Sequence, residues 1–230
     1  MLLYTGVLFA GPLTAQHLPR YTTGWWDVAV LAGGAAIAGA GAIARPPVAA
    51  CAPCDPADLP AIDRGVIAWH SGFARGASDV LVLGVAGGAV LAATWKIPAA
   101  RARGDAVVLA SALTWTAAAT EWIKVAVHRR RPALYRGGAP DAATVIDNRK
   151  SFPSGHTAIA FSAATAYTTM AVRQRLPHAR RNALLLYGGA VLVGTLRVAG
   201  GKHFPTDVVA GAALGSAVGW LTARLHPVTP

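Results

Sequence analysis

Long uninterrupted apolar blocks are the feature of this sequence that most limits its fold. A block of about 18 or more apolar residues is long enough to cross a lipid bilayer as a helix. Such blocks lie at about residues 25–44, 78–95, 106–127, 155–172, 183–198 and 205–225. Their alanine and glycine content suits close packing of helices in lipid. The sequence therefore predicts an all-α, polytopic membrane protein, a bundle of six transmembrane helices.

The remaining segments are short. Residues 1–24 form an N-terminal segment, and residues 25–230 are expected to form one membrane-embedded domain. The first 15 residues resemble the apolar core of a signal peptide but lack its basic leader, so we expect no cleavage. Prolines in residues 45–60 predict a loop. Apolar residues at helical spacing in residues 61–73 predict a short helix lying in the membrane interface.

The loop at 45–60 also contains both cysteines, Cys51 and Cys54. No further ligands of the zinc-binding type lie nearby, which argues against a zinc site. Two alternatives stay open, a local disulfide or two idle thiols.

The net charge of +11 restricts the partners of the chain. A basic balance fits nucleic acid, anionic lipid or a phosphorylated substrate. Because the basic residues lie in loops between apolar blocks, nucleic acid is excluded as a partner. A phosphate-bearing substrate and the lipid bilayer remain.

Basic residues in short loops also predict the orientation of the bundle. Two of the loops are expected to be cytoplasmic because they carry Lys96, Arg101, Arg103, Arg173, Arg175, Arg180 and Arg181. Both tails then lie inside as well, and the loop at 45–60 is periplasmic. The loop after the third block is also basic, but phosphate binding offers a second explanation for its charges. We therefore expect a site at the extracytoplasmic edge of the membrane.

Three segments on this outer side carry the residues suited to chemistry. They are residues 124–132 (KVAVHRRRP), 153–156 (PSGH) and 197–207 (RVAGGKHFPTD). They are far apart in the sequence and can meet only if the helices form a bundle.

The first segment supplies cations. Lys124, His128 and Arg131 follow one another at i, i+4 and i+7, which would place them on one face of a helix. Arginine binds phosphate through two parallel hydrogen bonds, and lysine acts as a point charge. Arg129 and Arg130 are interpreted instead as basic residues that end a span at the membrane interface.

The second segment begins the fourth block. Ser154 is expected to cap that helix, and Gly155 allows the backbone to approach an anion closely. Free N–H groups at a helix start form an anion site. His156 lies in that first turn and would be close to a bound phosphate.

The third segment supplies a second imidazole. Arg197 ends the fifth block, a glycine turn follows, and His203 precedes Asp207 by four residues. Asp207 could accept a hydrogen bond from one nitrogen of His203 and leave the other free to attack phosphorus. The alternative is a histidine–aspartate pair that only stabilises a loop.

Three other charged residues have simpler expected roles. Glu121 lies inside a span and is expected to pair with Lys124. Asp79 is interpreted as a charge at a helix terminus. Lys202 is expected to be solvated or to face lipid.

Together, K(x6)RP, PSGH and R(x5)H(x3)D resemble the signature of the type 2 phosphatidic acid phosphatase family, which are integral-membrane lipid phosphate phosphatases. The resemblance covers roughly residues 60–225. One departure is Leu196, where the family often has serine, which removes one hydroxyl contact to phosphate.

The resemblance implies a six-helix bundle and hydrolysis through a phosphohistidine, with no metal and no other cofactor. His203 would attack phosphorus, Asp207 would orient it, and His156 would protonate the leaving oxygen and then activate water. The phosphoryl oxygens would be held by the residues Lys124, Arg131, Arg197, Ser154 and Gly155.

The function expected on this basis is a lipid phosphatase in a bacterial inner membrane, with its site facing the periplasm or exterior. Candidate substrates are a polyprenyl diphosphate such as undecaprenyl diphosphate, phosphatidic acid and phosphatidylglycerophosphate. A phosphotransferase that passes the phosphoryl group to another acceptor is an alternative, as is a non-catalytic lipid-binding membrane protein. The substrate and the oligomeric state stay open.

Overall fold

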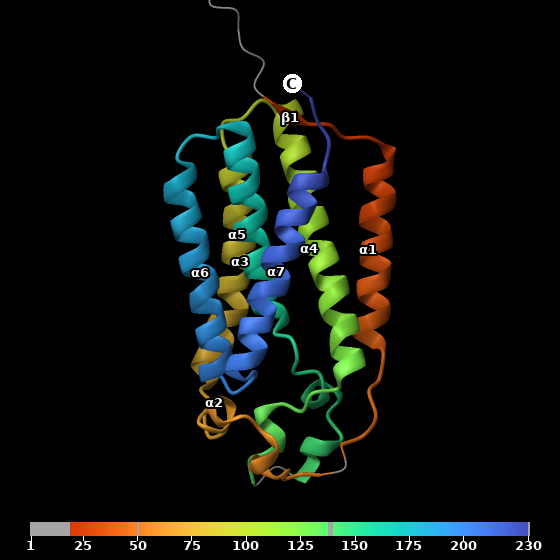
Figure 1. The fold of residues 1–230 in the computed structure, drawn as a ribbon, viewed down its shortest axis with the longest axis vertical. Coiled ribbons are helices and arrows are strands. Elements are labelled where there is room, and N and C mark those ends of the chain that lie inside the picture. The colour runs from red at the N-terminus through yellow and green to blue at the C-terminus, as the bar shows by residue number, and fades with distance from the viewer. Residues whose placement is uncertain (1–18, 50, 138–139, 230) are drawn as a thin grey trace, which may run out of the picture.

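The computed structural model describes residues 19–49, 51–137 and 140–229, and its helices run side by side in a bundle (Figure 1). The α-helices are α1 (Trp25–Ile43), α2 (Ala61–Arg64), α3 (Gly72–Thr94), α4 (Ala99–Val127), α5 (Gly155–Gln174), α6 (Ala179–Ala199) and α7 (Pro205–Leu225). Short 3₁₀ turns occur at Pro56–Asp58, Pro132–Leu134, Pro140–Ala143 and Ile146–Arg149. The signal-like first 15 residues lie outside the described part of the chain.

Each predicted apolar block corresponds to a long helix. The helices α3, α4 and α6 begin earlier than predicted, because their first turns are polar and carry little hydrophobic signal. In α3, for example, the Ser71 hydroxyl accepts a hydrogen bond from the Ala74 amide, 3.2 Å away, and so starts the helix at Gly72.

The predicted interfacial helix at 61–73 is wrong. The helix α2 contains only Ala61–Arg64, and Phe73 already belongs to α3. The reason is that Asp63, within α2, is fully buried and hydrogen-bonded to the amide of Thr206, 3.2 Å away. The segment is therefore tied to the first turn of α7.

In the described part of the chain, five helical segments are long and apolar enough to cross a membrane. They are Trp25–Ile43, Gly72–Thr94, Ala99–Leu134 (α4 with the turn that follows it), Ala179–Ala199 and Pro205–Leu225. The protein is therefore an integral membrane protein. The sixth long helix, α5, has 20 residues but is less apolar, and it lies among α3, α4, α6 and α7 (Figure 1). A helix covered by protein on all sides needs no lipid-facing apolar surface.

The polar side chains of α5 bond to its neighbours. Ser162 accepts a hydrogen bond from Thr116 of α4 at 2.9 Å, and Thr165 lies 2.8 Å from the hydroxyl of Tyr187 on α6. These bonds satisfy hydroxyl groups that would otherwise be costly to bury.

Close packing of α5 against α7 depends on glycine. A side chain on Gly215 would place its Cβ only 2.0 Å from the Ala158 carbonyl oxygen. A Cβ on Gly211 would lie 2.5 Å from the Ser154 carbonyl oxygen, and a Cβ on Gly219 would lie 2.5 Å from the Ser162 carbonyl oxygen. The absence of side chains lets the two backbones approach, which is a common means of joining helices in lipid.

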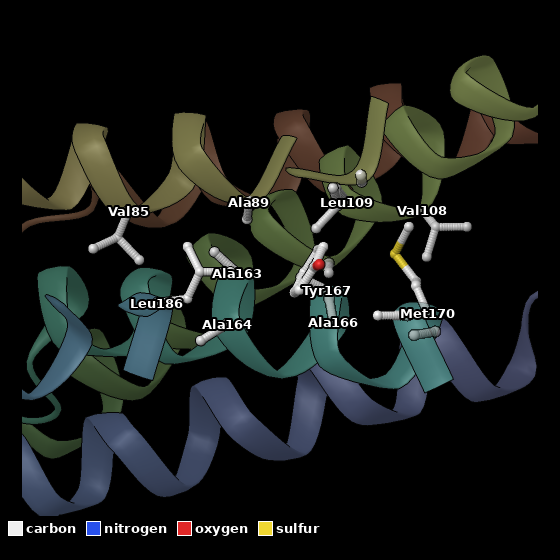
Figure 2. Close-up of a cluster of buried hydrophobic side chains, with 14 of the residues drawn as sticks. Val85, Ala89, Val108, Leu109, Ala163, Ala164, Ala166, Tyr167, Met170 and Leu186 are labelled. Atoms are coloured by element: carbon white, nitrogen blue, oxygen red, sulfur yellow. The ribbon is translucent and has the colours of Figure 1, made fainter. Parts of the chain in front are cut away.

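Small residues also dominate the core between α3, α4, α5 and α6 (Figure 2). Tyr167 and Met170 fill its centre, and alanines such as Ala89 and Ala163 keep the helices close. Because lipid tails are themselves apolar, the dense packing of these side chains contributes more to helix association than exclusion of water does.

The two ends of the bundle differ (Figure 1). At one end the short connections 95–98 and 175–178 lie with the strands β1 (Arg20–Tyr21) and β2 (Val228–Thr229), which pair antiparallel. At the other end lie the longer segments 44–71, 128–154 and 200–204. The prediction that the three motif segments share one end is thereby confirmed.

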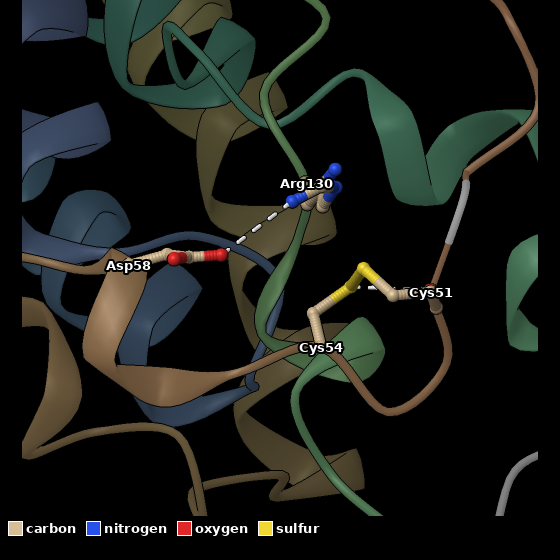
Figure 3. Close-up of a disulfide and its surroundings, with 4 residues drawn as sticks. All are labelled: Cys51, Cys54, Asp58 and Arg130. Carbon is tan, nitrogen blue, oxygen red and sulfur yellow. Dashed lines mark hydrogen bonds and ion pairs between the residues drawn. A yellow bond between two sulfur atoms is a disulfide. The ribbon is translucent and has the colours of Figure 1, made fainter.

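A disulfide joins Cys51 to Cys54 in the loop after α1 (Figure 3). Of the two alternatives from the sequence, the local disulfide is the one observed. The amide of Cys54 donates to the Leu134 carbonyl, 2.7 Å away, which ties this loop to the chain that follows the first motif.

Candidate active site

His203 lies in the tight turn between α6 and α7. Gly201 makes this turn with a φ of +64°, and a side chain there would collide with the Trp69 carbonyl oxygen, 2.1 Å from the position of its Cβ. His203 is only 1% exposed. Its Nδ1 lies 2.8 Å from the Ser151 carbonyl oxygen, which can only accept a hydrogen bond. The proton therefore resides on Nδ1, and Nε2 keeps its lone pair.

The environment of His203 keeps this imidazole neutral. Burial lowers the pKa of His203 well below its ordinary value of 6.5, and the positive charges of Arg131, Arg197 and Lys124 lower it further. The three cations predicted to bind phosphate thus all act on one buried nitrogen base. A neutral imidazole with an unprotonated Nε2 is the form that can act as a nucleophile.

Asp207 does not make the predicted hydrogen bond to His203. Its nearest oxygen is 3.6 Å from Nδ1, beyond hydrogen-bonding distance, and the Ser151 carbonyl takes that role. Asp207 instead accepts bonds from the Ser151 hydroxyl at 2.6 Å and from the Phe204 amide at 2.9 Å. The carboxylate therefore holds the turn that carries His203 and adds a negative charge near the ring.

Arg129 is part of this arrangement, which contradicts its interpretation as an interfacial basic residue. Its guanidinium bonds to Asp207 and, at 2.6 Å, to Asp63, and it lies over the Phe204 ring. Two buried carboxylates thus share one arginine. Arg130, in contrast, is half exposed and lies 3.9 Å from Asp58, as expected for a surface residue (Figure 3).

The predicted helical face of Lys124, His128 and Arg131 is also wrong. The helix α4 ends at Val127, and His128 has a φ of 52°, so the chain leaves the helix before reaching Arg131. The left-handed residue His128 thus ends the helix before Pro132 is reached. Lys124 remains on the helix and pairs with Glu121 at 2.6 Å, which confirms that prediction.

Arg131 is buried and held from several sides. It donates to the side chain of Asp147 at 2.8 Å and to the carbonyl oxygen of Lys202 at 2.7 Å. One terminal nitrogen of its guanidinium lies 3.4 Å from Nε2 of His203. Partial burial would raise the pKa of Asp147, but Arg131 and Lys202 outweigh it and keep that pKa below its ordinary value. Arg131 thus presents a fixed positive charge beside the candidate nucleophile.

Lys202 lies beside the site without contacting His203. Its side chain is partly exposed, and its ammonium lies 3.4 Å from Asp147.

Arg197 presents an open donor. One terminal nitrogen of its guanidinium donates to Asp79 at 2.8 Å and to Ser78 at 3.2 Å. Among the described residues, its Nε is buried and has no hydrogen-bond partner. A buried N–H without a partner is costly, and a guanidinium N–H is a donor of the kind that phosphoryl oxygens accept.

Asp79 connects Arg197 to the second histidine. The same carboxylate oxygen lies 2.9 Å from Nε2 of His156. The interpretation of Asp79 as a helix-terminus charge is therefore wrong, because α3 begins seven positions earlier at Gly72 and places Asp79 beside the site. His156 is held by its carboxylate while 35% of its side chain remains exposed.

The start of α5 lies next to Lys124. A Cβ on Gly155 would be 3.2 Å from Nζ of Lys124, so glycine allows the ammonium to approach the helix start. Ser154 occupies the N-cap position, but its hydroxyl pairs with Thr157 at 2.9 Å and makes no cap bond. The Ser154 amide donates to the Asp207 carbonyl at 2.9 Å, so the predicted phosphate contact of Ser154 is wrong. The amides from Gly155 onward in the first turn have no partner within the helix and can face an anion.

A cavity of about 360 Å³ opens onto this point. Its polar wall contains Lys124, Glu121, Thr120, Gly155 and His156. The rest of the lining, its apolar wall, consists of Val82, Leu83, Ala86, Ala117 and Ile159. The cavity lies between α3, α4 and α5, and Leu83 is among the large hydrophobic residues exposed on the surface of the bundle. It can therefore hold a ligand with one charged end and one apolar end.

Several site residues were not found from the sequence: Asp63, Asp79, Arg129, Asp147 and Ser151. A carboxylate so near a span could have singled out Asp79, since an unpaired charge there is costly. Ser151 carried no such signal, because its carbonyl acts through the loop conformation.

The family-model comparison now identifies the class of protein. The model of the PAP2 superfamily matches residues 105–229, more than half of the chain, so this protein belongs to the PAP2 superfamily. No curated protein matches the sequence significantly. Among solved structures, the chain is similar to one described as the first transmembrane PAP2 type phosphatidylglycerolphosphate phosphatase from Bacillus subtilis. The identity is 23%, the match covers 86% of this chain and 91% of that chain, and the TM-score is 0.40.

Proposed function

We propose that this protein is a membrane lipid phosphatase that hydrolyses a lipid phosphate or diphosphate through a phosphohistidine on His203. The observation that carries the proposal is the buried imidazole of His203, whose Nδ1 lies 2.8 Å from the Ser151 carbonyl oxygen and whose Nε2 lies 3.4 Å from the guanidinium of Arg131. The cavity beside this site supports a lipid substrate, because its apolar wall can hold a lipid chain. Membership of the PAP2 superfamily supports the phosphatase activity.

In the first step, the lone pair on Nε2 of His203 attacks phosphorus and the bond from phosphorus to the lipid oxygen breaks. Nδ1–H of His203 continues to donate to the Ser151 carbonyl, which holds the ring in the correct orientation. The phosphorylated ring gains positive charge, and Asp207 at 3.6 Å stabilises it. Lys124, Arg131, Arg197 and the first-turn amides of α5 from Gly155 onward hold the phosphoryl oxygens.

His156 handles the proton of the leaving group. With Nε2–H donating to Asp79, protonated Nδ1 can give its proton to the lipid oxygen as that bond breaks. In the second step, neutral His156 takes a proton from water. The resulting hydroxide attacks phosphorus, the bond to Nε2 of His203 breaks, and inorganic phosphate is released. No metal ion takes part in either step.

The position of the site relative to the membrane follows from the same proposal. The helix α5 would be the sixth span, since its 20 residues rise about 30 Å, the thickness of the hydrocarbon core. The site would then lie at the extracytoplasmic edge, because the basic connections 95–98 and 175–178 are at the other end of the bundle. Substrates with an exposed phosphate and a long apolar chain fit this placement, including polyprenyl diphosphate, phosphatidic acid and phosphatidylglycerophosphate.

The test is phosphate release by the protein purified in detergent, with EDTA present, from each of these three lipids. His203→Ala serves as the inactive variant. His178→Asn is the matched control, because His178 lies at the other end of the bundle with a φ of 56°, which asparagine tolerates. Release that survives EDTA and His178→Asn but not His203→Ala supports the proposal. Release by His203→Ala at the wild-type rate, or no release from any lipid, contradicts it.

A further inference from the structure

Thr120 has a buried hydroxyl that the rest of the site does not explain. It lies on α4 one turn before Lys124 and is 2% exposed. Within the described part of the chain, its Oγ1 has no hydrogen-bond partner. Other helical threonines donate to a carbonyl one turn back, as Thr94, Thr168 and Thr195 do at 2.7–3.0 Å. Burying a hydroxyl without a partner is unfavourable, so we expect the hydroxyl of Thr120 to hydrogen-bond to a bound ligand.

The position of Thr120 indicates what that ligand atom is. Thr120 lines the cavity together with Lys124 and His156. A Cβ on Gly155 would lie 3.2 Å from Nζ of Lys124 and 3.4 Å from Cγ2 of Thr120, so both side chains meet the start of α5. Ala117 lies about one turn before Thr120 on α4, farther from the site, and belongs to the apolar wall. Thr120 thus lies where the charged part of the cavity meets its apolar part.

A lipid phosphate in this cavity would place its phosphate near Lys124 and its chain along the apolar wall. The atom at the boundary is then the oxygen that joins the two. That oxygen gains negative charge as its bond to phosphorus breaks, and a hydroxyl donor beside it stabilises the transition state more than the ground state.

We propose that Thr120 is a further catalytic residue, whose hydroxyl donates a hydrogen bond to the leaving oxygen of the lipid. This inference rests on the proposed function and adds a contact to it. His156 supplies the proton, and Thr120 stabilises the oxygen until that proton has been transferred. The substrate class it favours is a phosphate ester of an aliphatic alcohol, because an alkoxide is a poor leaving group and needs this assistance.

The test compares Thr120→Val with Thr120→Ser on two esters with similar apolar chains, a long-chain alkyl phosphate and an alkylphenyl phosphate. Valine keeps the shape of threonine and removes the hydroxyl, while serine keeps the hydroxyl. We expect Thr120→Val to lower kcat on the alkyl phosphate by about 10- to 100-fold with KM nearly unchanged. On the alkylphenyl phosphate the loss should be less than about threefold, because a phenoxide leaves with little assistance. Thr120→Ser should restore most of the rate.

Ser111→Ala is the matched control. Ser111 lies on the same helix, and its hydroxyl is also buried without a partner among the described residues, but it lines a cavity at the other end of the bundle. Its kinetics should equal those of the wild type, and melting temperatures should show that all variants are folded.

The outcomes separate the two proposals. If the wild type is active and Thr120→Val loses equal activity on both esters, or loses none, the role of Thr120 is overturned and the proposed function stands. A wild type inactive on both esters overturns the proposed function and this inference with it.

Discussion

The two histidines of the site occupy contrasting surroundings. His203 is sealed in the loop end of the bundle, with 1% exposure and fixed partners on both sides of its ring. His156 is at the mouth of a cavity, with 35% of its side chain exposed and one carboxylate partner, Asp79. The rigid side suits a nucleophile that must not move. The open side suits a proton carrier that must meet a leaving group, then water.

The same contrast extends to the residues behind each ring. Behind His203 a buried network links Ser151, Asp207, Arg129 and Asp63, so each side chain depends on the others. Behind His156 a half-exposed Asp79 contacts only a few groups. Changes on the sealed side should therefore disturb both catalysis and stability. Changes on the open side should mainly alter the dependence of the rate on the leaving group.

The largest effect is expected from His203→Gln, which removes the nucleophile and keeps a polar side chain. The rate of phosphate release should fall by about 10⁴-fold or more. Phosphate assays on detergent-purified protein measure it, with His178→Asn run beside it. A variant that keeps a tenth of the wild-type rate would show that His203 is not the nucleophile.

Asp79→Asn should have the next largest effect, because it removes the charge that holds His156 and Arg197. We expect kcat on an alkyl phosphate to fall by about 100-fold, in the range typical of lost general acid catalysis. The loss on an alkylphenyl phosphate should be clearly smaller. Asp58→Asn is the control, since Asp58 is exposed and pairs only loosely with Arg130. Equal losses on both esters would mean that Asp79 does not act through His156.

Ser151→Ala should have a moderate effect. The variant removes the hydroxyl bond to Asp207 but keeps the carbonyl that accepts from His203. We expect kcat to fall by about tenfold with KM unchanged, the size expected for one hydrogen bond to a charged group. Ser151→Thr, which keeps a hydroxyl, should retain more activity. Full activity in Ser151→Ala would show that Asp207 needs no support from this residue.

The smallest effect is a dependence of stability on pH. Because the pKa of His203 is lowered in the folded protein, the ring stays neutral there and gains a proton on unfolding below pH 6.5. Its contribution to stability is complete above pH 6.5 and decreases as the pH falls, by at most about 1.4 kcal/mol per pH unit. The melting temperature of the wild type relative to His203→Gln should therefore decrease between pH 7.5 and pH 5. A constant difference would mean that His203 titrates normally.

The sequence predicted the helices and the clustering of the motif segments because both depend on patterns visible along the chain. Apolar blocks of bilayer length have few alternatives to helices. Once those helices alternate in direction, the segments with Lys124, His156 and His203 must share an end of the bundle. The Glu121–Lys124 pair was predictable for the same reason, since residues three apart on a helix are neighbours.

The connections within the site were less predictable because they depend on loop conformation. The left-handed His128 ends α4 early and redirects Arg129 into the interior, which no helical periodicity indicates. The Ser151 carbonyl reaches His203 because main-chain bonds join Arg129 and Arg131 to Ser151 and Asn148. A contact made by a main-chain carbonyl cannot be predicted from the residue type, because every residue carries the same carbonyl group. Asp63 was assigned to an interfacial helix, and its burial depends on that same loop packing.

The most direct test of the central claim is to trap the phosphoenzyme. Protein mixed with a lipid phosphate and quenched in alkali within milliseconds should carry a phosphoryl group that is stable to base and labile to acid. Peptide mass spectrometry should place it on His203, and the His203→Gln variant should carry none. A phosphoryl group on His156, or an active enzyme with no phosphohistidine at any time, would contradict the account.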